Sequence, residues 1–503
     1  MSLPLYLWKL KEDTRGHALD FGLDFFEVVF ELVSNEDLNE IAAYGGFPVR
    51  YPHWRFGMEY DRMAKGHLYG LHKIYEMVIN NDPCYAYLVE GSSQIDYKLI
   101  MAHVYAHSDF FKNNMWFSHT NRKMMDEMAN HATRIRRYID RYGVERVEKV
   151  IDACLSLDNL IDFHFPDQAA LSQAAREAEA EGKPADHRFP IDSPEYLESY
   201  LYPQEYVDSH RKKHEAAQAK ARKIPPSPVK DVMHFLSVHA PLEEWERDII
   251  SMIREEALYY APQGQTKIMN EGWAAYWHSR ILTEKTLDSS EIVDFADSHS
   301  KTTAVHGKSI NPYKLGLELF RDIEDRWNKG KFGKEYEECN DFRLRRMWDR
   351  GLGAGQEKIF QIRQVYNDVS FLDEFLTPEF CLEHKLFTWV FKEQYNRYVI
   401  DSRQFEEVKQ SLLKQITNFG HPIIRVVDAN HGNRGELLLE HTHEGEDLDQ
   451  RYARDVLMNL QAIWRRPVHI LTMIGSENQF WTHDGTTFEA GKRADPVEPE
   501  SDK

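Results

Sequence analysis

The chain has few cysteines, and no motif joins them. Its 503 residues include only four, and none belongs to a C-x-x-C pair; they are Cys84, Cys154, Cys339 and Cys381. Without paired spacing, the sequence predicts neither a zinc knuckle nor a disulfide framework. This cysteine usage is typical of a reducing compartment, so we expect a cytoplasmic protein.

The chain also lacks a long apolar run and an excess of positive charge. The apolar patch at residues 3–8 is too short for a signal-peptide core and far too short for a membrane span. With 62 basic and 82 acidic residues, the formal net charge is −20, which opposes non-specific attraction to phosphate backbones or anionic membranes. We therefore expect no membrane span and no nucleic acid as a partner.

Three common catalytic or nucleotide-binding signatures are missing from the sequence. It contains no Walker-type P-loop, no Gly-x-Gly-x-x-Gly dinucleotide fingerprint and no Gly-x-Ser-x-Gly elbow. What is present is 42% hydrophobic residues with a 13% share of aromatics, the composition of a soluble globular protein with large side chains for its core. At this length we expect two or three domains.

Hydrophobic periodicity divides the chain into a helical part and a mixed part. Helical spacing predominates in the first three-quarters, and it predicts a helix over residues 19–44 among others. Beyond about residue 381, short alternating segments indicate strands with intervening helices. The sequence predicts a mainly α-helical region over 1–380 with a charged surface insertion at about 165–230, a small α+β C-terminal domain over 381–490, and a loose tail over 491–503.

Two helical segments carry residues that could bind a metal ion. His103 and His107 are four residues apart, so on a helix they project from one face, one turn apart. Two imidazoles and one carboxylate from another helix, here Glu271, fill three tetrahedral corners and leave the fourth for water or substrate. We expect these residues to bind a metal, with zinc as the expected ion, which requires Glu271 to lie within about 8 Å of the imidazole pair.

A structural explanation of the same residues stays open. With 24 histidines in the chain, chance gives about one pair at this spacing. His103, His107 and His278 lie among aromatic residues, where histidines are often hydrogen-bonded core residues. Glu271 fits this explanation less well, because a carboxylate in an aromatic, low-charge stretch needs a metal, a cation or hydrogen-bond donors.

The general base of zinc proteases is missing. In H-E-x-x-H enzymes a glutamate follows the first histidine, but this position is Val104. Asp109 points roughly 200° away from His107, at about 100° per residue, and should not replace it. His278, two turns past Glu271, could be a fourth ligand, an outer-shell partner or a replacement acid/base, and His53 on its loop is another candidate for the catalytic group.

Two further sites carry weaker signals. His441 and His443 alternate as in a strand, for which a solvated edge strand is the favoured explanation. Residues 297–299 and 304–308 precede a turn at 310–316 and could line a pocket, although a plain helix cap is favoured.

Taken together, several segments resemble the SpoVR family, the stage V sporulation protein R proteins of bacteria. The resemblance spans nearly the whole chain and is carried by Tyr51–Trp54, Asn80–Tyr87, Ser108–Asn114, His239–Glu243, Gln265–Ala274, Ile310–Gly316 and Asn433–Leu437. It implies a link to sporulation or, outside spore formers, to stress and stationary-phase physiology, with other proteins of such a system as partners. It does not imply a particular reaction.

A looser similarity links the candidate site to gluzincin metallopeptidases. Asn270–Ala274 is similar to their Asn-Glu-Gly-Phe-Ala helix, and His103–Asn114 to their His-Glu-x-x-His helix, which implies a gluzincin-like helical core. The ligands match and the base does not. The chain between the histidine pair and the carboxylate ligand is longer here than in gluzincins. One departure from the SpoVR pattern is Arg465, where Trp-Gly-Arg-Pro is expected, and it should alter a turn.

Two functional hypotheses follow from the sequence. The first is a metal-binding helical domain, either an atypical zinc-dependent hydrolase acting on peptide or cell-wall-derived bonds or a relative that only binds. The second is a non-enzymatic partner protein in a stress or sporulation system. The sequence leaves the substrate and the oligomeric state open.

Overall fold

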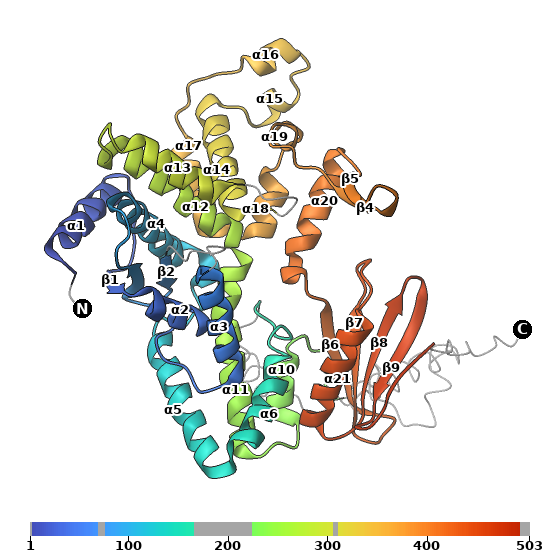
Figure 1. The fold of residues 1–503 in the computed structure, drawn as a ribbon. Coiled ribbons are helices and arrows are strands. Elements are labelled where there is room, and N and C mark those ends of the chain that lie inside the picture. The colour runs from blue at the N-terminus through green and yellow to red at the C-terminus, as the bar shows by residue number, and fades with distance from the viewer. Residues whose placement is uncertain (1–2, 69–75, 165–223, 305–309, 493–503) are drawn as a thin grey trace, which may run out of the picture. The chain divides into compact units, whose positions relative to one another are not determined.

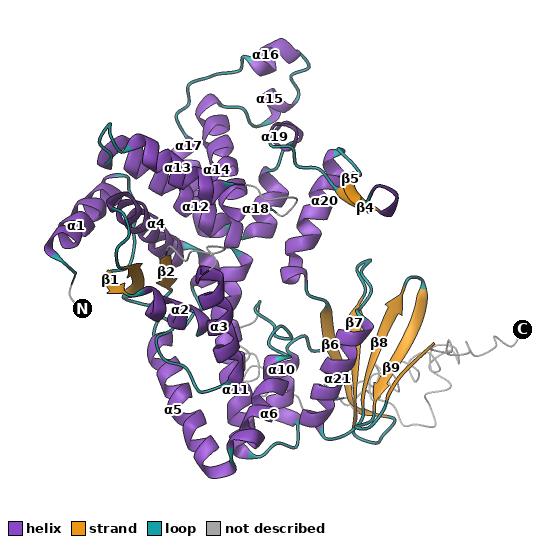
Figure 2. Ribbon diagram, viewed as in Figure 1, coloured by secondary structure: helices purple, strands orange, loops and turns teal. Residues whose placement is uncertain are grey.

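The computed structural model describes residues 3–68, 76–164, 224–304 and 310–492. The chain forms two compact units: the first comprises residues 1–137 and 259–420, and the second comprises residues 138–258 and 421–503. Figures 1 and 2 show a helical N-terminal region and a C-terminal sheet, which confirms the predicted fold class. The gluzincin-like core and the domain limits stay predictions. No helix among the described residues combines the length and the apolar character needed to cross a bilayer.

The first unit is built mainly of helices. Its helices are α1 (Leu5–Asp20), α2 (Asn35–Ala43), α3 (Trp54–Leu68), α4 (Gln94–Asn113), most of α5 (Met124–Tyr142), α12 (Lys267–Ile281), α13 (Ile292–Thr303), α14 (Pro312–Lys329), α15 (Lys334–Glu337), α16 (Phe342–Arg346), α17 (Gly355–Val365), α18 (Asp368–Phe375), α19 (Pro378–Glu383) and α20 (Phe405–Ile416). Its strands are β1 (Val28–Val33), β2 (Glu76–Ile79) and β3 (Cys84–Val89) in one sheet, and β4 (Trp389–Lys392) and β5 (Arg397–Ile400) in a hairpin.

The helix predicted over residues 19–44 is confirmed for α2 and is wrong between α1 and α2. Val28–Val33 forms β1, which pairs in parallel with β3 from Val28↔Cys84 to Val33↔Val89. The run of β-branched and aromatic residues favours a strand, and pairing with a distant segment decides the outcome. Helix α2 begins only at Asn35, after a capping box between Ser34 and Asp37.

The core of the first unit lies where α4, α12 and α14 meet. Most positions of α4 and α12 are buried all round, as expected for interior helices. Helix α4 begins with a capping box between Ser93 and Asp96. Helix α12 has no side-chain cap of its own, and instead Asp368 accepts hydrogen bonds from Ile268 N and Met269 N at 2.8 and 2.9 Å. A residue about 100 positions away thus fixes the start of the helix that carries Glu271.

Helices α12 and α14 touch at two glycines. A Cβ atom on Gly272 would lie 2.4 Å from Gly316 Cα, and one on Gly316 would lie 2.1 Å from Ile268 O. Both contacts are with backbone atoms, which cannot move aside as a flexible side chain can. The two helices therefore pack at a distance that only glycine permits.

The second unit combines helices with a five-stranded sheet. Its helices are α6 (Val144–Leu155), α10 (Val232–His239), most of α11 (Glu244–Gln265) and α21 (Gln450–Trp464). Its strands are β6 (Ile423–His431), β7 (Glu436–Thr442), β8 (Val468–Ile474), β9 (Glu477–His483) and β10 (Phe488–Lys492), in the order β10-β9-β8-β7-β6. Only β7 and β8 are parallel neighbours in it, and α21 is the crossover between them.

Several local predictions about the second unit can be compared with the structure. Strand β7 lies between β6 and β8 and His441 is buried, so the solvated edge strand predicted for His441 and His443 is wrong.

Arg465, which replaces an expected glycine, ends α21 with φ +60°, and it forms an ion pair with Glu246 at 2.5 Å. The predicted insertion lies outside the described residues except for 224–230, and the predicted tail except for 491–492, which end β10.

We expect Gly272→Ala to lower the free energy of unfolding by about 3 kcal/mol, because its methyl group overlaps the backbone of α14. Urea unfolding followed by circular dichroism measures the change. Gly16→Ala in α1 is the matched control, since its Cβ would meet nothing within 4 Å. The free energy of unfolding of that variant should rise by about 0.5–1 kcal/mol. Equal effects at the two positions would contradict the tight helix contact.

A second prediction concerns Glu436 in the Asn433–Leu437 segment. Hydrogen bonds from Arg434, at 2.6 and 2.8 Å, together with His469, lower the pKa of Glu436 to about 2 against the opposing effect of burial. A folded-state pKa below the unfolded value means that the carboxylate stabilises the fold at neutral pH, and that this stabilisation is lost as the pH falls from about 5 through 2. Glu436→Gln should therefore cost about 1–3 kcal/mol at pH 7 and much less near pH 3.

Urea unfolding at the two pH values tests this expectation. Glu440→Gln on the exposed side of the same strand is the control and should change stability by less than about 0.5 kcal/mol. A Glu436→Gln effect of the same size at pH 7 and pH 3 would show that the charge does not matter.

Candidate metal centre

His103 and His107 project from α4 into the interior of the first unit. Their side chains are only 1% and 4% exposed. The helix spacing that predicted a shared face is observed, and the two rings lie nearly perpendicular with centroids 4.5 Å apart. Each ring also stacks on an aromatic side chain, His103 on Tyr313 and His107 on Phe111, with centroids 5.9 Å apart in both pairs.

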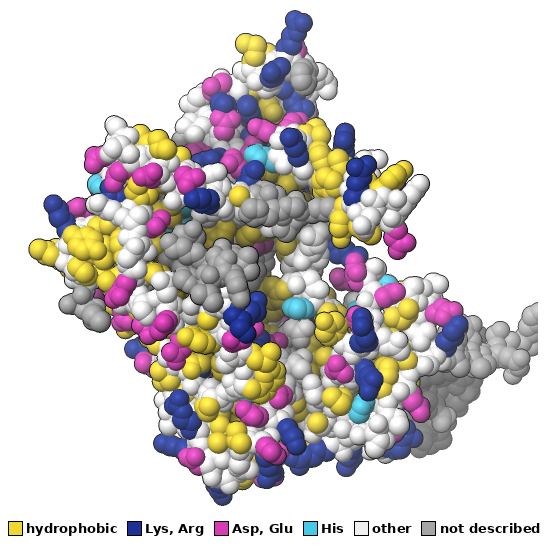
Figure 3. Space-filling view, viewed as in Figure 1, with side chains coloured by type: hydrophobic (Ala, Val, Ile, Leu, Met, Phe, Trp, Pro, Cys, Tyr) yellow, Lys and Arg dark blue, Asp and Glu magenta, His cyan; other side chains and the backbone are white. Residues whose placement is uncertain are grey.

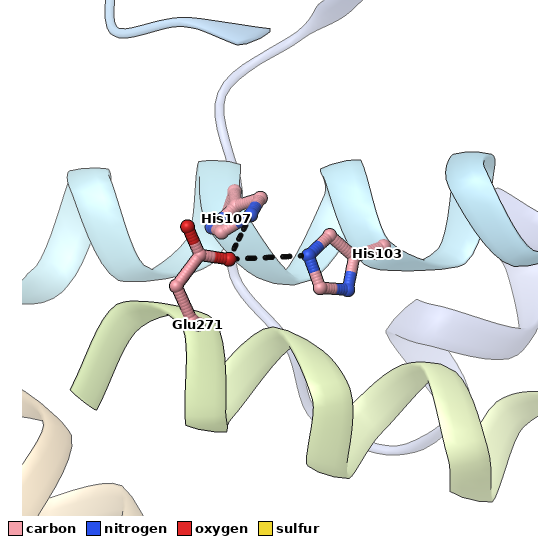
Figure 4. A group of neighbouring side chains, drawn as sticks. All are labelled: His103, His107 and Glu271. Carbon is pink, nitrogen blue, oxygen red and sulfur yellow. Dashed lines mark ion pairs between the residues drawn. The ribbon is translucent and has the colours of Figure 1, made fainter. Parts of the chain in front are cut away.

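Glu271 reaches the two imidazoles from α12, as Figure 4 shows. Its Oε2 lies 3.6 Å from His103 Nε2 and 3.5 Å from His107 Nε2. These distances are well inside the 8 Å limit that the hypothesis required. Among the described residues, this is the one group of three or more metal-ligating side chains whose donor atoms all lie within 4.8 Å of one another.

The distances distinguish a hydrogen-bonded cluster from a ligand set. Hydrogen bonds between nitrogen and oxygen are about 2.7–3.2 Å long. Two donor atoms of a tetrahedral zinc ion, each about 2.0–2.1 Å from the metal, lie about 3.3 Å apart. The observed 3.5 and 3.6 Å are closer to the separation of two ligands, so the donor set fits a small divalent cation.

The surroundings keep Glu271 in the form that a metal requires. Burial raises the pKa of this carboxyl, but the adjacent His103 and His107 imidazoles and the nearby Tyr313 side chain outweigh it and lower the pKa. The side chain is 18% exposed, more than either histidine. Its Oε2, the atom that faces the two imidazoles, is buried.

Each imidazole has a buried partner on α12 at its second nitrogen. Asn270 Oδ1 lies 2.9 Å from His107 Nδ1, and since an amide oxygen only accepts, His107 donates from Nδ1 and keeps the lone pair of Nε2 toward Glu271. On the other imidazole, His278 Nδ1 lies 2.8 Å from His103 Nδ1. Such outer-shell contacts orient metal-binding histidines.

His278 lies behind His103, away from Glu271. Besides the contact with His103, its Nε2 lies 3.0 Å from His299 Nδ1 on α13. Burial, followed by the charges of the neighbouring imidazoles, lowers the pKa of His278 well below its usual value. Of the three roles considered for this residue, the contacts favour the outer-shell partner.

His53 is also buried, on the segment between α2 and α3. Its Nδ1 accepts a hydrogen bond from Arg55 N at 3.3 Å, and its ring packs against Trp54 and Phe56. The group formed by the two metal-site histidines and Glu271 does not include it. Its catalytic role stays a prediction.

Neither Val104 nor Asp109 offers a base at the site. Val104 is fully buried among apolar residues. Asp109 accepts hydrogen bonds from Arg363 Nη1 at 2.5 Å and from Trp273 Nε1 at 2.9 Å, which confirms that it faces away from the histidine pair. Burial raises its pKa to about 6 against the opposing charge of Arg363.

Sequence reasoning gave no role to three residues around the centre: Asn270, Tyr313 and His299. Asn270 and Tyr313 stand inside segments that carried the family resemblance, which is the signal that could have found them. His299 belongs to α13, in the weak 297–299 segment. At the turn over 310–316, Asn311 caps α14 by accepting a hydrogen bond from Lys314 N, as favoured, whereas residues 305–308 of that prediction lie outside the described residues.

Comparisons with known proteins cover almost the whole chain. The model of the family described as SpoVR like protein matches residues 5–421, and that of the SpoVR-like C-terminal domain matches residues 422–474. A protein of Escherichia coli (strain K12) named "Uncharacterized protein YcgB" is 29% identical over 485 residues, which are 88% of this chain and 87% of that protein. No solved structure matches.

Proposed function

We propose that this chain, which belongs to the SpoVR family, binds a divalent metal ion, zinc, with His103, His107 and Glu271. The observation that carries the proposal is the convergence of two imidazole nitrogens and one carboxylate oxygen at ligand separations inside a helical core. Imidazole and carboxylate together suit zinc among the common divalent ions. The outer-shell contacts of both imidazoles support the same assignment.

Three protein ligands are the number found in catalytic zinc sites, where one position stays open. A bound zinc ion supplies Lewis-acid chemistry, because it polarises a carbonyl oxygen and makes water more acidic. His103, His107 and Glu271 would hold the ion, while Asn270 and His278 orient the two imidazoles. Glu271 is the most exposed of the three, with 18% of its side chain accessible to solvent.

The reaction we propose is an atypical metal-dependent hydrolysis of peptide or cell-wall-derived bonds. It is atypical because the position of the usual glutamate base is Val104, and a lost general base typically costs about 10²–10⁴ in rate. His278 and His53 are the acid/base candidates that the sequence predicted. The buried contacts of His278 with His103 and His299 support a role in orienting His103.

A second candidate function is metal binding without catalysis, in a cytoplasmic partner protein of a stress or sporulation system. Val104 favours it, because a buried valine accepts no proton. The net charge of −20 also suits protein partners more than nucleic acid. On the face drawn in Figure 3, basic and acidic side chains are interspersed.

Metal analysis tests the proposed site. Protein purified without chelator should contain about one zinc ion per chain. The double variant His103→Ala/His107→Ala should contain almost none, because a single carboxylate remains. The control is His441→Ala/His443→Ala, which removes a histidine pair from the second unit and should leave the zinc content unchanged. If the wild-type protein contains no zinc after growth and dialysis with added zinc, the proposed site is refuted.

Activity and partners separate the two candidate functions. The zinc-loaded chain, the chelated chain and the His103→Ala/His107→Ala variant are incubated with a peptide library and with cell-wall fragments. Cleavage by the zinc-loaded chain alone supports the hydrolase function. Absence of cleavage, together with partners that co-purify from native cells with wild type and not with the double variant, supports the non-catalytic role.

A further inference from the structure

The buried side of the candidate centre continues into a row of three imidazoles. His103 Nδ1 lies 2.8 Å from His278 Nδ1, and His278 Nε2 lies 3.0 Å from His299 Nδ1. Both separations are hydrogen-bond lengths. His103 and His278 are buried, whereas His299 on α13 is half-buried. The row therefore runs from the proposed metal ligand to a side chain that solvent reaches.

Hydrogen bonding restricts this row to two arrangements. A neutral imidazole has one N–H and one lone pair, so each link needs a donor on one ring and an acceptor on the other. In the outward order, His103 donates from Nδ1 to His278, and His278 donates from Nε2 to His299. In the inward order every donor is reversed, and His103 carries its proton on Nε2, the nitrogen that faces Glu271.

Only the outward order leaves the lone pair of His103 Nε2 available for a metal. The inward order instead lets His103 Nε2 donate toward the Glu271 carboxylate. Both orders contain three protons on three rings, so conversion between them requires no net gain or loss of a proton. In the reversal from outward to inward order, one proton crosses each hydrogen bond, from His103 Nδ1 to His278 Nδ1 and from His278 Nε2 to His299 Nδ1. His299 then releases its Nε2 proton to solvent, which reaches this half-buried ring, and His103 Nε2 takes up one proton in place of the metal, so the number of protons is unchanged.

We propose that His278 and His299 are positioning residues that hold His103 in the Nδ1–H tautomer required for metal binding, and that the row reverses its order when the metal is removed. The proposal rests on the proposed function, because it assumes that His103 binds a metal. Asn270 supports it by contrast: an amide oxygen fixes His107 in a single tautomer, whereas an imidazole partner allows His103 both.

Two substitutions at position 278 separate the hydrogen-bond acceptor from packing. In His278→Asn, Oδ1 is as many bonds from the backbone as Nδ1 of histidine, and it accepts from His103 as Asn270 accepts from His107. In His278→Leu, a methyl group occupies that position and accepts nothing. Zinc affinity of the full chain is measured by competition with a chromophoric chelator, and thermal unfolding shows that each variant is folded.

We expect His278→Leu to weaken zinc binding on the order of 10- to 100-fold, and His278→Asn to stay within about threefold of wild type. Equal affinities for all three proteins would overturn the proposal, as would an equal loss in both variants. If wild type binds no zinc, the proposed function fails together with the positioning role. If wild type binds zinc and His278→Leu binds it with the same affinity, only the positioning role fails.

Nitrogen NMR of wild-type chain labelled with ¹⁵N-histidine provides a measurement that needs no leucine variant to fold. The spectrum of His278→Asn identifies the signals of residue 278. With zinc bound, His278 should be protonated on Nε2, and after chelation on Nδ1. The same tautomer in both states, or protonation on Nδ1 with zinc bound, would refute the reversal.

Discussion

The candidate centre depends on the close contact of α12 with α14 at Gly272 and Gly316. Glu271 is the neighbour of Gly272, so the depth at which α12 packs decides how far the carboxylate reaches toward α4. Asp368 fixes the same helix along its axis by accepting two backbone hydrogen bonds at its first turn. A site whose donor atoms must agree within a fraction of an ångström requires such rigid support, and here it comes from backbone contacts and a buried carboxylate.

Helix α4 is held by polar contacts of the same kind. Asp109, two residues beyond His107, accepts hydrogen bonds from Arg363 of α17 and from Trp273 of α12. Breaking a buried ion pair leaves an uncompensated charge, which typically costs about 3–5 kcal/mol. The ion pair with Arg363 and the hydrogen bond from Trp273 therefore hold α4, α12 and α17 together. The buried polar residues of this core divide into those that join the helices and those that surround the histidines.

The sequence was sufficient for the local part of this arrangement and insufficient for the distant part. The spacing of His103 and His107 predicts a shared face because helix geometry is local, and the aromatic surroundings of Glu271 indicate a buried carboxylate. Nothing local shows that His278 Nδ1 faces His103, since this depends on how two helices 175 residues apart cross. The same limit explains β1, whose apolar spacing suited a helix until pairing with β3 made it a strand.

The absence of the protease glutamate follows from the same packing. Position 104 faces the apolar core, where a carboxylate would be buried without a partner, so α4 could not accommodate that base without repacking. The Nδ1 atoms of the two imidazoles contact His278 and Asn270, so Nε2 is the nitrogen that each ring turns toward Glu271. Tyr313, at the start of α14, stacks on His103 and helps to lower the pKa of the Glu271 carboxyl. The start of α14 therefore contributes to the surroundings of the candidate centre, in addition to the helices that carry the two histidines and Glu271.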